Sequence, residues 1–328
     1  MSSRRRFLGA SVACAASAAA GFASCALAQV IGKTARIVVG FPPGGPTDLV
    51  ARLIADKIRG GYAATVIVDN KPGAGGRIAV EHVKSSVSDG SVMLITPASM
   101  MVLYPYVYKK LAYDALRDFT PVTTVCSFPF ALSVGPAVPG SVNTVADFVQ
   151  WCRANPKQAS YGSVVGSMLH FTGVMLGRAA GIELTSVPYK GTAPAIQDLL
   201  GGQIPATITP LAVALPHAKS GKLRVLATTG AERSPALPAA PTLKEAGYDL
   251  EAQEWTGIFV PAKTPPETVA QLNASIRDAL KSNEVVEGLA KIGYAPVGES
   301  PAGFARIVKA EYDRWGPIVK ASGFSPED

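Results

Sequence analysis

Short runs of β-branched residues alternate along this chain with longer stretches that carry a helical stripe of apolar side chains. The runs predict strands, and the amphipathic stretches predict helices that would cover a sheet. Strands are expected over residues 37–41, 66–69, 92–96, 121–125, 130–134, 184–187, 206–209, 223–228 and 255–260. Helices are expected over residues 47–59, 77–85, 145–154, 168–180, 193–200, 212–220, 265–281, 284–291 and 302–321. This alternation indicates an α/β fold.

Two segments, near residues 120–126 and 223–229, are placed where strands could cross between two lobes. Residues 29–122 together with 228–328 would then form a discontinuous first lobe, and residues 123–227 would form the second. The chain of 328 residues is long enough for two domains with cores of their own. A ligand would be expected between the lobes, because interfaces between lobes are favoured binding sites.

The N-terminal segment, residues 1–28, is typical of an export signal. Residues 3–8, SRRRFL, resemble the twin-arginine pattern S-R-R-x-F-L, and an apolar stretch rich in alanine follows. Residues 26–28, ALA, supply a small-x-small cleavage site, so we expect cleavage after Ala28 and a periplasmic mature protein. A retained membrane anchor is less favoured because the apolar stretch is short. The basic N-terminus fits both the twin-arginine and the general secretory route.

Composition and charge narrow the possible partners. The formal net charge is +7, but three of the cations lie in the predicted export signal and no Lys/Arg run follows it. We therefore expect a mixed solvated surface and no nucleic-acid partner. Cys126 and Cys152 are the cysteines of the mature chain. An oxidising compartment would permit a disulfide between them, and two small buried thiols fit equally well.

The first strand–turn–helix junction reads IVVGFPPGGPTDLVAR over residues 37–52. Pro46 suits the first turn of a helix, and Gly44 and Gly45 would let a ligand approach the backbone closely. The start of a helix offers unpaired N–H groups and a partial positive charge to an anion. Asp48 could act as a general base, but the favoured interpretation is that it stabilises the first turn or orients the preceding loop.

Two further junctions, over residues 161–168 and 187–194, repeat this arrangement. Ser167 is the expected N-cap of the helix that carries His170, and Thr192 is the expected N-cap of the next helix. If the three helix starts faced each other across a cleft, they would suit a small anion with separated carboxylates. The alternative is that all three are only well-made turns.

The sequence lacks the common motifs of nucleotide-binding, nucleophilic and metal sites. There is no Walker A sequence, the glycines of residues 73–76 lack the third glycine of a dinucleotide fingerprint, and GSVVG at residues 162–166 is not a nucleophile elbow. The histidines, His82, His170 and His217, are far apart and form no H-x-x-x-H pair. We therefore expect no metal, no cofactor and no catalytic residue.

Several stretches are recognisable when they are taken together. They are residues 39–52 (VGFPPGGPTDLVAR), 69–76 (DNKPGAGG), 89–96 (DGSVMLIT), 161–170 (YGSVVGSMLH), 187–202 (VPYKGTAPAIQDLLGG), 223–241 (LRVLATTGAERSPALPAAP) and 255–266. This combination resembles the Bug family of extracytoplasmic solute receptors, the binding proteins of tripartite tricarboxylate transporters. The resemblance runs in family order across nearly the whole mature chain.

The resemblance implies a two-lobed type II periplasmic-binding-protein (Venus flytrap) fold with two crossover strands. It also implies a small ligand, commonly a carboxylate, that backbone amides, hydroxyls and bridging waters hold between the lobes. The positions that match the family's ligand contacts are Phe41, Pro43, Gly44, Gly45, Thr47, Asp48, Ala98, Ser99, Ser163, Ser167, His170, Tyr189, Gly191 and Thr192.

This chain departs from the family pattern in ways that would make the site less polar. After Gly201-Gly202-Gln203 the family usually has an apolar residue and then aspartate, but this chain has Ile204-Pro205-Ala206. Val164-Val165 stands where glycine or proline is common, and Met168 where proline is common. We interpret the protein as a monomeric periplasmic receptor, not an enzyme, that delivers a small organic acid to integral membrane transporter subunits. Two alternatives stay open: a ligand sensor for a signalling partner, and an exported hydrolase that uses Ser163 or Ser167 with His170.

Overall fold

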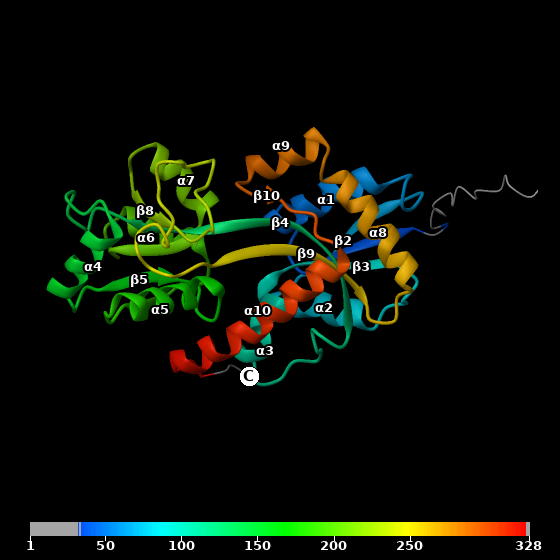
Figure 1. Cartoon of the computed structure of the whole chain (residues 1–328), viewed down its shortest axis with the longest axis horizontal. Coiled ribbons are helices and arrows are strands. Elements are labelled where there is room, and N and C mark those ends of the chain that lie inside the picture. The colour runs from blue at the N-terminus through cyan, green and yellow to red at the C-terminus, as the bar shows by residue number, and fades with distance from the viewer. Residues whose placement is uncertain (1–31, 33, 326–328) are drawn as a thin grey trace, which may run out of the picture.

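The computed structural model describes residues 32 and 34–325, so the predicted export signal lies outside the described residues. The strands are β1 (Ala35–Val39), β2 (Val66–Asn70), β3 (Val92–Pro97), β4 (Phe119–Val134), β5 (Ser160–Ser163), β6 (Thr185–Pro188), β7 (Ala206–Pro210), β8 (Arg224–Thr228), β9 (Gln253–Pro261) and β10 (Ala295–Pro296). The helices are α1 (Pro46–Ile58), α2 (Arg77–Lys84), α3 (Tyr104–Val107), α4 (Val145–Ala154), α5 (Met168–Ala180), α6 (Thr192–Leu200), α7 (Leu211–Lys219), α8 (Pro266–Ala279), α9 (Asn283–Lys291) and α10 (Pro301–Ser322), with short helical segments η1 (Ala74–Gly76) and η2 (Ser99–Leu103). Figure 1 shows two groups of elements that β4 and β9 join.

The first lobe is built on a sheet in which β1 lies between β2 and β3. These three strands are parallel, and β9 runs antiparallel to β3 and continues the sheet to β4. Helices α1, α8 and α9 cover one face, while α2, α3 and α10 cover the other. Val38 packs toward one face and its neighbours Ile37 and Val39 toward the other, and all three are fully buried. Burial on both faces explains why this strand reads as a continuous apolar run.

Strand β4 links the two lobes. Its residues from Phe119 to Pro129 pair with β9, and its residues from Phe130 to Val134 pair with β7 and β8. The sequence predicted two separate strands here, but pairing with β9 keeps residues 126–129 extended, so they form one strand of 16 residues. The second long strand along the hinge is β9. The segment near residues 223–229 forms β8, which pairs with the second-lobe half of β4. The lobe boundaries themselves stay a prediction.

The second lobe continues the sheet from β4 through β7 and β5 to β6. Helices α4 and α5 pack on one face, and α6 and α7 pack on the other. Strand β5 is missing from the predicted strand ranges, although a strand end was expected at the junction over residues 161–168, because its sequence SYGS contains a single β-forming residue, Tyr161. It forms because β6 and β7 pair with it on either side, so tertiary context overrides its weak propensity.

Helix α10 ties the second lobe to the first. It starts beside α8 and ends beside α5 (Figure 1). The Trp315 ring lies 6.4 Å from the Phe171 ring of α5, and Phe324 beyond the helix lies 5.5 Å from that same ring. Arg178 of α5 donates a hydrogen bond to the carbonyl of Ala321. The buried core is therefore continuous between the lobes on this side.

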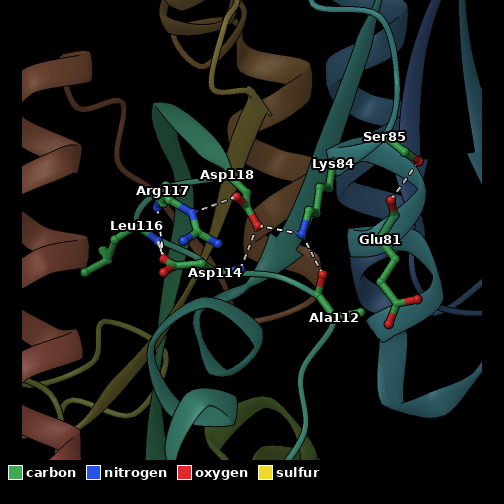
Figure 2. Close-up of polar contacts among 8 residues, drawn as sticks. All are labelled: Glu81, Lys84, Ser85, Ala112, Asp114, Leu116, Arg117 and Asp118. Atoms are coloured by element: carbon green, nitrogen blue, oxygen red, sulfur yellow. Dashed lines mark hydrogen bonds and ion pairs between the residues drawn. The ribbon is translucent and has the colours of Figure 1, made fainter.

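A polar cluster fixes the segment that leads into β4 (Figure 2). Lys84 Nζ donates to the Ala112 carbonyl at 2.7 Å and forms a 2.9 Å ion pair with Asp118. Asp118 also accepts from the Asp114 amide at 2.8 Å and from Arg117 Nε at 3.3 Å. These contacts anchor the start of the hinge strand to α2, and none of the predicted ligand contacts takes part in them.

Cys126 and Cys152 are free thiols, and both are buried. Of the two alternatives for these cysteines, the structure therefore has the two small buried thiols. Burial raises the pKa of Cys126 to about 12 and that of Cys152 to about 11, so neither is a reactive thiolate at neutral pH.

In the part of the chain that the structure describes, no helix is long and apolar enough to cross a bilayer.

Candidate functional site

Strand register sets the two groups of predicted site loops opposite each other. In the first lobe, β1, β2 and β3 end at the edge where β9 begins, and β4 leaves the lobe there, with Pro129 opposite Gln253. In the second lobe, β4 enters beside Pro210, the last residue of β7, and β5 and β6 run parallel to β7. The loops after β1, β3, β5 and β6 therefore lie on the two edges that adjoin the hinge, where ligands of open α/β sheets bind.

Asp48 organises the loop between β1 and α1. Its side chain is 1% exposed, and four hydrogen bonds converge on its two oxygens. Oδ2 accepts from the Gly44 amide at 2.9 Å and from Arg52 Nε at 2.8 Å. Oδ1 accepts from Asn70 Nδ2 at 2.8 Å and from the second guanidinium nitrogen of Arg52 at 3.1 Å. This confirms the interpretation that Asp48 orients the loop, and its saturated oxygens leave no room for general-base chemistry.

The surroundings of Asp48 favour its ionised form. Burial alone would raise the pKa of the carboxyl, but the hydrogen bonds from Arg52, Gly44 and Asn70 together outweigh burial and lower the pKa below 3.8. Asn70 at the end of β2 also donates to the Phe41 carbonyl at 3.1 Å, so it joins the two sides of the loop. Asn70 was not among the predicted residues, because its place beside Asp48 depends on the register of β2 against β1.

The loop leaves the start of α1 without a side-chain cap. Gly44 has a left-handed φ of +83°, which favours glycine, and Gly45 is the N-cap without a side chain to cover the helix end. Pro46 occupies the first helical position, so the amides of Thr47 and Asp48 are the first that point out of the helix. Pro43 is exposed, and the Phe41 side chain is partly buried against both cores of the first lobe. The amides can donate hydrogen bonds to the oxygens of an anion without any positively charged side chain.

Close backbone packing supports this loop from below. A Cβ on Gly40 would lie 2.8 Å from Cα and 2.9 Å from the carbonyl oxygen of Gly76. Gly76 has a φ of +93° and lies under Met100. The loops after β1 and β2 can therefore approach each other only because both positions are glycine.

In the loop after β3, the hydrogen-bond donors of Ser99 already bind the carboxyl group of Glu254. The Ser99 amide donates to Glu254 Oε1 at 3.0 Å, and the Ser99 hydroxyl donates to the same oxygen at 2.6 Å. Burial raises the pKa of Glu254, and the two hydrogen bonds from Ser99 offset part of this rise. Ala98, another predicted ligand contact, is fully buried. Glu254 was missed because it lies 155 residues from Ser99 in the chain, and no local motif marks it.

In the second lobe, Ser167 caps α5 as predicted. The Ser167 hydroxyl accepts from the His170 amide at 3.5 Å and donates to the Val164 carbonyl at 2.5 Å. Ser163 is 2% exposed, and its hydroxyl shares a 3.0 Å hydrogen bond with the Ser186 hydroxyl. Both hydroxyls thus have structural partners, although the amides at the start of α5 remain directed toward the hinge edge.

His170 is neutral at physiological pH. Burial lowers the pKa of its imidazole, and its ring packs 4.8 Å from Phe171 and 5.9 Å from Phe324. Nδ1 accepts from the Gly166 amide at 3.4 Å, which assigns the proton to Nε2. In the described residues no hydrogen bond joins the His170 imidazole to the hydroxyl of Ser163 or Ser167, so the nucleophile and base that a hydrolase needs are not paired.

The junction before α6 differs from its prediction. Gly191 is the N-cap, and Thr192 is already the first helical residue. Pro194 then falls in the first turn, where its missing N–H removes a donor that would have no helical partner. The Tyr189 hydroxyl donates to Asp198 at 2.7 Å, so Tyr189 is fastened to its own lobe. Thr192 is partly exposed, and its hydroxyl has no hydrogen bond among the described residues.

Comparisons with known proteins agree on one family. Residues 50–324 match the tripartite tricarboxylate transporter family receptor. The chain belongs to this family. Protein BugT of Bordetella pertussis is 32% identical over 291 residues, which span 88% of this chain and 89% of BugT. A Pseudomonas protein from a tcbD-tcbE intergenic region is 34% identical over 285 residues, 86% of this chain and 84% of that protein.

Solved structures give the same family and its fold. The R. palustris protein Rpa4515, solved with adipate, is 36% identical, has a TM-score of 0.77 and is matched over 98% of its length by 90% of this chain. MatC of Rhodopseudomonas palustris, solved with bound malate, is 30% identical with a TM-score of 0.72, and 87% of this chain covers 98% of it. This chain therefore has the two-lobed fold of a periplasmic binding protein, as the family resemblance of its sequence implied. Members of this family are solute-binding receptors.

Proposed function

We propose that this receptor captures a small carboxylate between its lobes in the periplasm and delivers it to the membrane subunits of a tripartite tricarboxylate transporter. The ligand's carboxylate lies at the start of α1, within reach of the Thr47 amide and hydroxyl, and the loops before α5 and α6 close over it. The protein acts by binding and release and performs no chemistry on its ligand.

The observation that carries this proposal is the opposition of the two sets of helix starts across the hinge. Loops that follow β1 and β3 adjoin the same hinge strands as loops that follow β5 and β6. Amide-lined helix starts favour an anion, and two of them from different lobes can hold one ligand that neither lobe could enclose alone. The relatives solved with malate and adipate support a carboxylate as that anion.

Closure of the lobes would report that the site is loaded. The hinge consists of β4 and β9, which can bend where β4 passes from one pairing partner to the next, between Pro129 and Phe130. A ligand that contacts both lobes stabilises the closed arrangement because it binds that arrangement more tightly than the open one. The closed outer surface then gives the transporter a state to recognise.

Thr47 offers the sharpest test. Its hydroxyl has no hydrogen bond in the described part of the chain, so Thr47→Ala removes a ligand contact without breaking an internal one. A hydrogen bond to a charged ligand oxygen contributes about 1.5–3 kcal/mol, so affinity should fall tenfold or more. Thr65→Ala is the matched control, because Thr65 is exposed and precedes β2 at the opposite edge of the sheet.

Isothermal titration calorimetry with a panel of small mono-, di- and hydroxycarboxylates, malate and adipate included, measures both variants. We expect micromolar or tighter binding of at least one acid, a tenfold or larger loss in Thr47→Ala and no change in Thr65→Ala. Equal affinity in wild type and Thr47→Ala would show that the start of α1 does not bind the ligand. A wild-type protein that binds no carboxylate would refute the proposed ligand class.

A further inference from the structure

The first lobe carries a resident carboxyl group at the place where a second ligand carboxylate would bind. Both donors of Ser99, its amide and its hydroxyl, point at Glu254 Oε1. The strand register explains the contact. Pro97, the last residue of β3, lies opposite Thr256 of β9, so Ser99 follows β3 where Glu254 lies near the start of β9. The donors that an incoming anion would use at the end of β3 are thus already engaged.

The other oxygen of Glu254 is available at this hinge edge. Glu254 is partly buried, and no hydrogen bond to Oε2 is found among the residues that the structure describes. No Lys or Arg forms an ion pair with Glu254 within this same part of the chain. Its electrostatic neighbours are Tyr104, Tyr294 and Glu311, which bring no positive charge. Glu254 therefore has an acceptor, Oε2, without a hydrogen-bond partner in the described part of the chain.

We propose that Glu254 determines ligand specificity: it selects a carboxylic acid whose far end carries a hydroxyl or ammonium group over a dicarboxylate of the same length. This inference rests on the proposed function, because it assumes that α1 holds the near carboxylate. A hydroxyl or ammonium group supplies the donor that Oε2 lacks, and an ammonium also neutralises the carboxylate. A second carboxylate would instead face a like charge with Ser99 already engaged.

Protonation should relax this selection. Burial raises the pKa of Glu254, so lowering the pH converts Oε2 into a donor before ordinary carboxyls protonate. The groups that face Glu254 are Ser99 on η2, Tyr104 on α3, Tyr294 ahead of β10 and Glu311 on α10. Of these only Glu311 titrates below pH 8, and its protonation also removes negative charge from the site.

The experiment uses matched acids at four and at six carbons. Each set contains the dicarboxylate, the ω-hydroxy acid, the ω-amino acid and the plain monocarboxylate, titrated by calorimetry into the mature protein. The variants are Glu254→Gln, which keeps an acceptor for Ser99 and replaces the charge, and Glu251→Gln as a control. Glu251 is exposed three residues earlier in the same segment, so it tests for a nonspecific charge effect.

We expect wild type to bind an ω-hydroxy or ω-amino acid at least tenfold more tightly than the dicarboxylate of equal length. Glu254→Gln should reduce this ratio at least tenfold, and Glu251→Gln should preserve it. Equal or tighter binding of the dicarboxylate by wild type overturns the inference even if Glu254→Gln fails to fold, and so does an unchanged ratio in that variant. Those results leave the proposed function intact, whereas wild type that binds none of the acids overturns both.

Discussion

Replacing Asp48 with asparagine tests how the first ligand loop is held. The substitution keeps the shape of the side chain but exchanges one acceptor oxygen for a donor. Gly44 N–H and Arg52 Nε converge on Oδ2, while Asn70 Nδ2 and the other Arg52 nitrogen converge on Oδ1. In either orientation of the new amide, its NH₂ group therefore faces two donors. Asn70 could turn over to accept from it, but Asn70 would then lose its hydrogen bond to the Phe41 carbonyl.

The cost follows from the exposure of each partner. Losing the hydrogen bond from Gly44 or Asn70 to a buried carboxylate costs about 1.5–3 kcal/mol. The bond to Arg52 counts for less, roughly 0–1 kcal/mol, because that side chain is 54% exposed. We expect Asp48→Asn to lower the free energy of unfolding by about 3 kcal/mol at pH 7. Because the folded pKa of Asp48 lies below 3.8, the difference from wild type is fully present above that pH and should shrink as the pH falls below it.

Urea denaturation followed by circular dichroism measures this difference, and calorimetry on the folded variant measures the accompanying loss of ligand affinity. Asp56→Asn is the control: Asp56 lies on the same helix, is 59% exposed and pairs with Arg59 at 3.6 Å, so we expect less than about 0.5 kcal/mol. A loss in Asp48→Asn no larger than in the control would refute the argument that Asp48 organises the loop.

Two other substitutions probe the packing around the site. Burial raises the pKa of Glu311 from 4.5 to about 7, so wild type loses stability as the pH rises through that window. Urea denaturation should find Glu311→Gln more stable than wild type at pH 8, by up to about 3 kcal/mol, and equal at pH 4; equal stability at pH 8 contradicts this. Gly40→Ala should destabilise by about 1–3 kcal/mol, since its Cβ would meet Gly76 backbone at 2.8 Å, whereas Gly140→Ala, with open space around it, should not.

The sequence was sufficient to place the loops of the candidate site, because these loops follow from local chemistry. The apolar run of β1, the glycines after it and Pro46 together mark a helix start without reference to the rest of the chain. Ser167 could be predicted as an N-cap on the same grounds. The family resemblance then supplied the two-lobed fold, which neither periodicity nor composition establishes.

The contacts that decide the chemistry could not be predicted, because they join distant parts of the chain. Glu254 reaches Ser99 only through the antiparallel register of β9 against β3, and Asn70 reaches Asp48 only through the pairing of β2 with β1. Single-residue errors came from local competition. Thr192 was predicted to cap α6, but the helix takes in Thr192 and begins after Gly191. The unpredicted β5 is held by its neighbours and not by its own propensity.

The most direct test of the account is a crystal structure of the receptor with the acid that co-purifies from its own host. We predict one carboxylate within hydrogen-bond distance of the amides at the start of α1, and contacts to the same molecule from the loop before α5 or α6. An acid bound to one lobe alone, or outside the two facing edges, would contradict the claim that helix starts from both lobes grip a single anion.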